Sequence, residues 1–457
     1  MLDKINNLDI LIKNARIVTM NENNDIIDKG FIGINNNEIK FVDTMENIDE
    51  EFKVNKVIDA DGKIVFPGLI NTHGHAYQIL LKGLGADLKL MDWVKVVVAP
   101  YSQKITREIN YYAALLVALE SLQSGCTTVA DFFYAHHKPK LSDGVIEGFM
   151  DMGLRGIMIR NFHDCGVENG IPESYLESPE EAFLDVDRLI NKYEEGSNGM
   201  IRIWTGPGVT WGITKEGLEA TVEYSKHKNI PYSIHLLETE DDNKHMMKEY
   251  GKKAVEIMEE VGFLSSDLLA AHCVKLADRE CKILGEKGVN VAYNAASNMY
   301  LGSGVPPIIK LKEAGARISL GTDGAASNNA MDMIETLKLS ALLQKVFYEK
   351  PNIISAEEVL NMATFQAAQS LQMEKEIGSL GNGKKADLFI FNPDKPKSFP
   401  LHDPIASLVY SASLDNVETT IVNGKVLYEN NKFKTAINKE YIFKKIKEII
   451  SELIKSN

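Results

Sequence analysis

Six residues that can bind a metal ion or move protons stand at or just beyond the ends of short apolar runs: His73, His75, His235, Glu238, His272 and Asp323. Three imidazole nitrogens and one carboxylate oxygen suit a divalent ion of borderline softness such as Zn²⁺ or Fe²⁺, with one position left for water. An ion held in this way lowers the pKa of a coordinated water molecule and provides hydroxide at neutral pH. The residue types therefore predict a metal-dependent hydrolase.

Each of the six residues has an expected role. The predicted metal ligands are His73, His75, His235 and Asp323, and the predicted catalytic groups are Glu238, His272 and Asp323. In an extended segment alternate residues point the same way, so His73 and His75 can face one ion. Asp323 can accept a proton from water through its second oxygen, and Glu238 can give a proton to a substrate ring nitrogen. His272 can hydrogen-bond the attacking oxygen.

Two alternatives bear on these roles. Glu238 is followed by Glu240, Asp241 and Asp242, so this stretch could instead be a solvated acidic loop. A barrel that binds metal or ligand without catalysis would be expected to lack at least one of Glu238, His272 and Asp323, and all three are present. Two-ion barrels commonly use a carboxylated lysine on the fourth strand, and the run IRIWTGPG contains none. One divalent ion per subunit is therefore expected, with Zn²⁺ preferred and Fe²⁺ as the alternative.

Eight short apolar or β-branched runs are predicted to be the strands that position these groups. They are Ile64–Asn71, Thr127–Phe133, Arg155–Phe162, Ile201–Gly206, Tyr232–Leu236, Leu268–His272, Val289–Asn294 and Arg317–Thr322. Helical patterning lies between most of them, as in Ile109–Ser124, and this alternation predicts parallel strands with right-handed crossovers. A doubly wound sheet would be expected to show a glycine-rich phosphate loop, which is not seen. The pattern favours an α/β fold of the (β/α)8 TIM-barrel type, spanning residues 63–375.

The two ends of the chain differ from this middle part. Residues 1–62 and 376–434 alternate apolar and polar residues and contain Asn and Gly turn signals. Two β-rich pieces that flank a barrel can bury their edges by pairing, so we expect them to form one small β-sandwich. Residues 435–457 are predicted as a C-terminal helix, amphipathic over Lys439–Lys455, that packs on the protein or on a partner subunit.

Composition excludes several kinds of partner. The net charge of −14 and pI near 5.3 disfavour binding to nucleic acid or to an anionic membrane surface. The four cysteines show no paired spacing, which indicates reduced thiols. No window approaches 18 apolar residues and no signal peptide is recognisable, so a cytoplasmic protein is expected.

Several segments together resemble the amidohydrolase superfamily, in particular its cytosine-deaminase-like branch. They are FPGLINTHGH, HLLETE, AAHCV, NAASNMYLGSGVPP and GTDGAASNNAMDM. The resemblance implies one Zn²⁺ or Fe²⁺ held by the four predicted ligands, Glu238 as the proton shuttle and His272 beside the hydroxide. It also implies hydrolytic replacement of an amino group, or of an alkylamino group or halide, on an electron-poor nitrogen heterocycle. Members of this kind are often homodimers or larger, so a homo-oligomer is expected.

Two positions separate the possible substrates. Adenosine-type members usually carry Glu nine residues after the Trp that corresponds to Trp93, where this chain has Ser102, and His where it has Gly208. Loss of both polar contacts would weaken binding of a nucleoside. The segments GLGADLKLMDW, TTVADFFYAHHKPKLSDGVIEGF and GSGVPPIIKLKEAG resemble members that act on 8-oxoguanine and on hydroxylated aminotriazines. Purine breakdown is more widespread than triazine degradation, so the predicted reaction is deamination of an oxopurine such as 8-oxoguanine or guanine. The alternatives are an adenosine-type deaminase acting on methylthioadenosine or S-adenosylhomocysteine, and an s-triazine amino- or chlorohydrolase that resembles hydroxyatrazine hydrolase.

Residues near the strand ends are candidates for substrate binding: Gln78, Trp93, Tyr134, His136, His137, Arg160 and Asn298. Tyr134 to His137 could instead form a loop packed over the barrel. Arg160 could pair with a ring carbonyl or with a neighbouring acid, and Asn298 could touch substrate or stabilise a turn.

Overall fold

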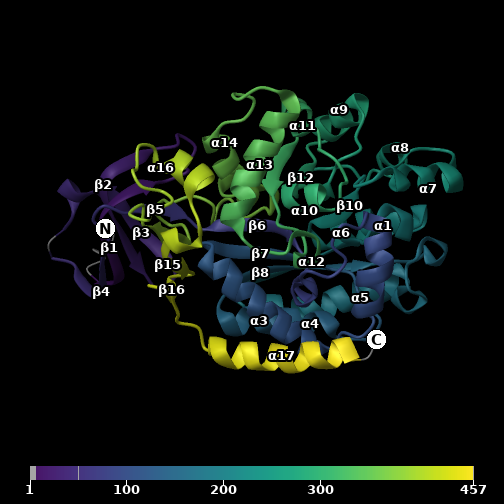
Figure 1. Cartoon of the computed structure of the whole chain (residues 1–457), viewed down its shortest axis with the longest axis horizontal. Helices are drawn as coiled ribbons and strands as arrows, with labels where there is room; N and C mark the ends of the chain where they lie inside the picture. The colour runs from purple at the N-terminus through teal and green to yellow at the C-terminus, as the bar shows by residue number, and fades with distance from the viewer. Residues whose placement is uncertain (1–6, 50, 456–457) are drawn as a thin grey trace.

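Eight parallel strands form the central sheet of the computed structural model, which describes residues 7–49 and 51–455. In chain order they are β6 (Leu69–Gly74), β7 (Cys126–Phe133), β8 (Arg155–Phe162), β9 (Ile201–Pro207), β10 (Tyr232–Leu236), β11 (Leu268–His272), β12 (Asn290–Tyr293) and β13 (Arg317–Leu320). Each strand pairs with the next in the chain. Thr72 Oγ1 donates to Leu320 O at 2.9 Å and Asp323 N to His73 O at 2.9 Å, so the last strand meets the first. The predicted (β/α)8 barrel is confirmed (Figure 1).

The first predicted strand is two strands. Residues Ile64–Pro67 form β5, which pairs with strands from both ends of the chain, and the barrel strand β6 begins only at Leu69. Gly68 separates them, and a Cβ there would lie 2.1 Å from Thr127 Oγ1. The sequence marks this change of sheet only by the dipeptide Pro67-Gly68, since the apolar residues on either side belong to two fully buried strands.

Helices pack around the barrel, both between its strands and after the last of them (Figure 1). They are α1 (Leu90–Trp93), α2 (Ala99–Ser102), α3 (Arg107–Gln123), α4 (Leu141–Met152), α5 (Pro179–Leu189), α6 (Lys215–Lys228), α7 (Glu240–Tyr250), α8 (Ala254–Glu260), α9 (Asp278–Glu286), α10 (Ala295–Tyr300), α11 (Ile308–Glu313), α12 (Ala325–Asn328), α13 (Met333–Tyr348), α14 (Ala356–Met362), α15 (Phe365–Ser370) and α16 (Pro404–Ala406). The helix predicted over Ile109–Ser124 begins two residues earlier, because Thr106 caps it by accepting a hydrogen bond from Ile109 N at 3.2 Å.

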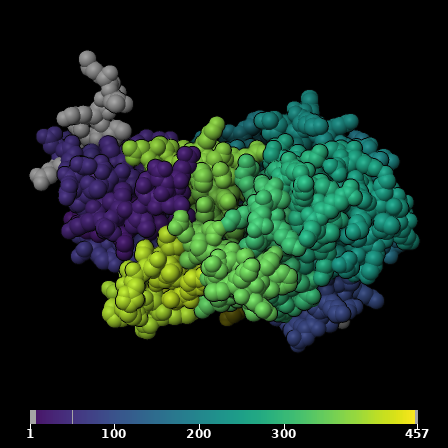
Figure 2. Space-filling model, turned by 90° about the horizontal axis from the view of Figure 1, so that it is seen from above, coloured from purple at the N-terminus to yellow at the C-terminus, as the bar shows by residue number. Residues whose placement is uncertain are grey.

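The two ends of the chain share one nine-stranded sheet. Its strands are β1 (Asn7–Val18), β2 (Ile26–Asn35), β3 (Glu38–Thr44), β4 (Lys53–Asp59), β5, β14 (Leu388–Phe391), β15 (Val417–Val422), β16 (Lys425–Glu429) and β17 (Lys432–Phe433). β5 joins the halves, since it runs parallel to β1 and antiparallel to β14. Ile12, Ile32, Leu388 and Ile421 are among the side chains of its buried core. Figure 2 shows the N-terminal and C-terminal parts side by side at one end of the molecule, so the predicted union of the two ends is confirmed. Residues 1–6 and 50 of the predicted segments lie outside the described residues.

The C-terminal helix α17 (Lys439–Lys455) lies along α3 (Figure 1). Its Ile442 and Ile446 are buried, and the hydroxyl groups of Tyr441 and Tyr112 are 3.2 Å apart. Residues 456–457 of this predicted segment lie outside the described residues. Among the helices described, none has the length and apolar character needed to cross a membrane.

Candidate active site

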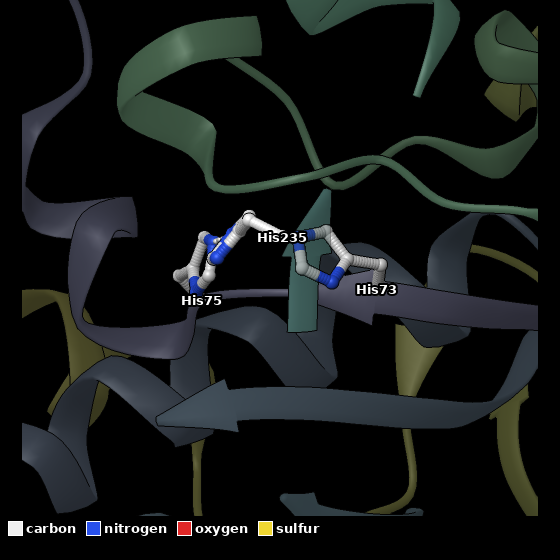
Figure 3. Close-up of side chains that lie close together, drawn as sticks. All are labelled: His73, His75 and His235. Atoms are coloured by element: carbon white, nitrogen blue, oxygen red, sulfur yellow. Dashed lines mark hydrogen bonds between the residues drawn. The ribbon is translucent and has the colours of Figure 1, made fainter. Parts of the chain in front are cut away.

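Three imidazoles and one carboxylate meet where the barrel strands end. His73 and His75 come from the end of β6 and His235 from β10, and their rings gather around one point (Figure 3). His75 Nε2 is 3.3 Å from His235 Nε2 and 3.1 Å from Asp323 Oδ1, while His73 Nε2 is 3.6 Å from that carboxylate oxygen. These distances bring the four predicted ligands close enough to share one ion.

Backbone carbonyl groups set the tautomers of two of these histidines. His75 Nδ1 is 2.6 Å from Phe132 O, and His235 Nδ1 is 2.7 Å from Gly208 O. Because a carbonyl oxygen only accepts, each Nδ1 carries the proton and each Nε2 turns a lone pair toward the cluster. His73 is fully buried, and neither of its ring nitrogens has a hydrogen-bond partner. Burial, reinforced by His75 and His235, lowers the pKa of His73 well below its ordinary value, which keeps it in the neutral form that binds metals.

Asp323 is held by its own set of donors. Its Oδ1 accepts from Gly324 N at 2.7 Å, and its Oδ2 accepts from Ser297 Oγ at 2.6 Å and from Ser327 Oγ at 3.2 Å. Burial raises the pKa of Asp323, but the contact with His75 and the charges of the neighbouring histidines outweigh it, so the pKa lies well below its usual range. The residue stands at a φ of 63°, in the left-handed region that asparagine and aspartate adopt more often than most other non-glycine residues.

Glu238 and His272 face each other beside this cluster. His272 Nε2 is 3.6 Å from Glu238 Oε2 and 3.8 Å from Asp323 Oδ2. Its Nδ1 is 2.9 Å from Asn298 Oδ1, which fixes the ring orientation, and Ser303 Oγ donates to Glu238 Oε1 at 3.0 Å. Burial raises the pKa of Glu238, so its carboxyl group takes up a proton more readily than a free glutamate. Burial alone would lower the pKa of His272, yet the carboxylates of Glu238 and Asp323 raise it overall.

A cavity opens directly onto these groups. Its polar wall includes His75, His235, Glu238, His272 and Asp323, with Asp242 nearby. Its apolar wall is formed by Leu90, Trp93, Val94, Val98, Ile171, Pro172, Val209, Trp211 and Leu301. A compact planar ring can therefore reach the metal-ligand cluster while the remainder of a substrate lies against apolar side chains.

The predicted substrate-binding residues divide into two groups. Gln78, Trp93 and Tyr134 line the cavity, and Gln78 Nε2 donates to the Tyr134 hydroxyl at 3.2 Å. His136, Arg160 and Asn298 do not line it, nor does His137, whose ring stacks on Tyr175. For these four, direct contact with substrate is not supported.

Three of them serve the structure in other ways. Arg160 pairs with Glu177 and with Asp185, the latter at 3.1 Å. His136 Nε2 is 3.1 Å from Phe133 O, and Asn298 orients His272 as described above. The ion-pair alternative for Arg160 is therefore the one that the geometry favours.

Sequence reasoning missed several residues of the cavity. His163, Tyr175 and Trp211 line it, and all three lie on connections that follow β8 and β9. The Tyr175 hydroxyl donates to Ser102 Oγ, so two hydroxyl groups stand together where only a lone serine was expected. Only the place of His163 in the sequence could have pointed to it. His163 directly follows a predicted barrel strand, and His235 likewise stands near the end of another.

Comparison with known proteins agrees with this geometry. The profile described as "Amidohydrolase family" matches residues 64–427. A 5-methylthioadenosine/S-adenosylhomocysteine deaminase of Acetivibrio thermocellus is 34% identical over 98% of this chain and 100% of its own length. A 5'-deoxyadenosine deaminase of Methanosarcina barkeri is 37% identical over 98% of both chains.

Solved structures give the same fold. A zinc complex of atrazine chlorohydrolase from Arthrobacter aurescens has a TM-score of 0.90 at 27% identity, covering 96% of this chain and 100% of that one. A zinc-bound structure described as an adenosine deaminase from Xanthomonas campestris has a TM-score of 0.91, covering 98% of this chain and 99% of that one; at 23% identity it shows the fold alone.

These relatives correct the substrate preference drawn from the sequence. The similar curated proteins carry adenosine-type names, so the oxopurine prediction is not supported and its adenosine-type alternative fits better. The inference from Ser102 and Gly208 considered two positions only, and the structure places the polar side chains of Tyr175 and His163 in the same cavity from other segments. The chain belongs to the amidohydrolase family, as a hydrolase that acts on carbon–nitrogen bonds.

Proposed function

We propose that this protein hydrolytically deaminates an adenine nucleoside whose 5' group is small and uncharged, as in 5'-deoxyadenosine or methylthioadenosine. The observation that carries the proposal is a cavity in which the predicted metal ligands, Glu238 and His272 stand beside an apolar wall. The near full-length similarity to adenosine-type deaminases supports the same reading.

The donor set fits a divalent ion. Two Nε2 lone pairs are directed by carbonyl groups behind the rings, and a third buried histidine has no other partner. With the Asp323 carboxylate they make a nitrogen-rich set that suits Zn²⁺, with Fe²⁺ as the alternative. When bound, such an ion supplies Lewis acidity that makes water a nucleophile at neutral pH.

The residues around the ion divide the remaining work. Water adds to purine C6, and Glu238 delivers a proton to the neighbouring N1, because its buried carboxyl group holds a proton more readily than usual. His272, oriented by Asn298, hydrogen-bonds the attacking oxygen, and Asp323 accepts the proton that the water loses. Asp323 then passes the proton that it took from water to the C6 amino group, which leaves as ammonia, and the proton of the added hydroxyl returns to Glu238 as the C6 carbonyl forms. Nucleoside plus water thus gives the 6-oxo nucleoside plus ammonia.

The cavity wall supports a neutral 5' group. Within the described part of the chain, the cavity is lined by no lysine or arginine, and its charged side chains are the acids Glu238, Asp242 and Asp323. S-adenosylhomocysteine places a charged amino-acid group at the 5' carbon, and its carboxylate would find no cation here. A methylthio or deoxy group would instead lie against apolar side chains such as Trp93 and Val98.

The experiment is ammonia release from a substrate panel, using zinc-reconstituted protein and a chelator-treated control. We expect the highest kcat/KM for 5'-deoxyadenosine and methylthioadenosine, with S-adenosylhomocysteine at least about tenfold lower, since an unpaired carboxylate loses a charge-assisted hydrogen bond. Guanine, 8-oxoguanine and aminated s-triazines complete the panel. Metal-dependent release from an oxopurine or a triazine alone would overturn the proposal.

A further inference from the structure

His163 is a buried histidine on the cavity wall for which the chemistry described so far has no use. It follows β8 directly, is 4% exposed and lines the same cavity as Glu238 and His272. Its Nδ1 lies near the backbone of Gly212 but has no hydrogen-bond partner. A buried polar atom without a partner costs about 1–3 kcal/mol, so an imidazole kept in this position is unfavourable for the protein by itself.

Two glycines make the space that this ring occupies. A Cβ at Gly208 would lie 2.1 Å from His163 Cε1 and 2.6 Å from its Nε2, and a Cβ at Gly212 would lie 2.5 Å from its Nδ1. Any other residue at either position would displace the imidazole. Gly208 O also accepts a hydrogen bond from Nδ1 of His235. The ring of His163 therefore lies against the same residue that orients a predicted metal ligand.

The imidazole is neutral under physiological conditions. Burial lowers the pKa of His163 to about 4, an effect that the nearby backbone of Gly212 offsets only in part. A neutral imidazole offers one donor and one acceptor, as sugar hydroxyls and purine nitrogens require. The Tyr134 ring, which also lines the cavity, stands edge-on to His163 with 6.2 Å between the ring centres.

We propose that His163 is a substrate-binding residue of this enzyme, whose neutral imidazole hydrogen-bonds the purine–ribose part of the bound nucleoside from the space left open by Gly208 and Gly212. The inference rests on the proposed function for the identity of the ligand. It deepens that function by naming a contact from the end of β8. Adenosine-type relatives usually carry a histidine at the position of Gly208, after β9, and this chain has no side chain there.

The first test is His163→Leu, which fills much of the same space without polar atoms. We expect KM for the best nucleoside to rise on the order of tenfold from the lost hydrogen bond, with kcat within about threefold of wild type. Bound zinc and the melting temperature should not fall, because removal of an unpaired buried polar group costs little. His227→Leu, at an exposed histidine of α6, controls for the substitution itself.

The second test moves the imidazole. Gly208→His alone should impair binding, because its side chain would collide with the ring of His163. The double variant His163→Gly/Gly208→His should recover most of the lost affinity, since the imidazole then enters the same space from β9. Because removal of His163 also relieves the collision, the comparison is with His163→Gly: a KM lower in the double variant than in His163→Gly is a result that a purely structural role for His163 would not produce.

Two results would overturn the inference: an unchanged KM in His163→Leu when wild type is active, or a melting temperature that falls by more than about 5 °C, as expected for a residue retained for packing. Inactivity of the wild-type enzyme toward every adenine nucleoside would instead remove the proposed function. The melting temperature of His163→Leu would then still decide whether the ring is kept for the fold, and a strong fall would overturn this inference as well.

Discussion

The buried ion pair between Arg155 and Asp387 provides a test of how the barrel is joined to the terminal sheet. Arg155 begins β8 and Asp387 precedes β14, and both side chains are 1% exposed. Arg155 Nε and Nη2 donate to the two carboxylate oxygens at 2.8 and 3.0 Å, and Asn423 N donates to Oδ1 at 2.7 Å. Asp387→Asn keeps the size of the side chain but leaves the guanidinium charge buried without a counter-charge.

Removing one partner of such a pair costs about 3–5 kcal/mol. The unfolding entropy of a chain of this length is about 1 kcal/mol per kelvin, so the melting temperature should fall by about 3–5 °C. The kcat at 25 °C should not change, because Arg155 lies at the strand end opposite the metal-ligand cluster. Calorimetric melting and steady-state kinetics on the same preparation measure both quantities.

An exposed ion pair provides the matched control. Lys310 and Asp278 are joined at 2.5 Å with side chains 46% and 80% exposed, so Asp278→Asn should lower the melting temperature much less than Asp387→Asn does. The double variant Arg155→Leu/Asp387→Leu should recover most of the stability, because no uncompensated charge remains. If Asp387→Asn lowered the melting temperature no more than Asp278→Asn does, the argument from burial would be refuted.

Three further predictions concern the active site and the acid range. Glu238→Gln should retain bound metal and lower kcat by about 10²–10⁴-fold, since it removes the proton shuttle; unchanged turnover would show that the shuttle was misassigned. Asn298→Ala should lower kcat by about 10–100-fold with little change in KM, because His272 loses the partner that orients it, and steady-state kinetics would detect the split. Burial raises the pKa of Asp143, but hydrogen bonds, chiefly from Arg188, lower it to about 2; the stability it contributes is complete above pH 4 and disappears as the pH falls toward 2. The difference in melting temperature between wild type and Asp143→Asn should therefore shrink from pH 5 to pH 2.5, and a constant difference would contradict the assignment.

Much of the architecture could be predicted from the sequence because it repeats a simple pattern. Buried parallel strands appear as apolar runs, and catalytic groups in such barrels stand at the carboxyl ends of strands, so His235, His272 and Asp323 could be assigned to one place before the fold was known. The structure brings all six predicted metal-binding and catalytic residues together.

The substrate side of the cavity was not predictable in the same way. Tyr175 and Trp211 lie in three-residue 3-10 helices within the connections after β8 and β9, and no periodicity in the sequence predicts where such connections return to the barrel. The ring of His163 occupies the space that a side chain at Gly208 would fill. A comparison of this sequence with its relatives one position at a time shows only that position 208 has no side chain. The break between β5 and β6 at Gly68 was missed because the apolar residues on both sides were taken as one strand in spite of the dipeptide Pro67-Gly68.

Gly68 leaves a single residue between β5 in the terminal sheet and β6, which carries His73 and His75. The strand that presents two of the predicted metal ligands is thus joined, through one residue, to the sheet built from both chain termini. No flexible linker separates the two. The terminal sheet is therefore part of the support for the metal-ligand strand, and trimming it or fusing a bulky partner to β1 is expected to disturb β6 together with the sheet. Engineers seeking a permissive attachment point would do better at the exposed loop around Gly251, which is separated from the ligands by the whole of α7.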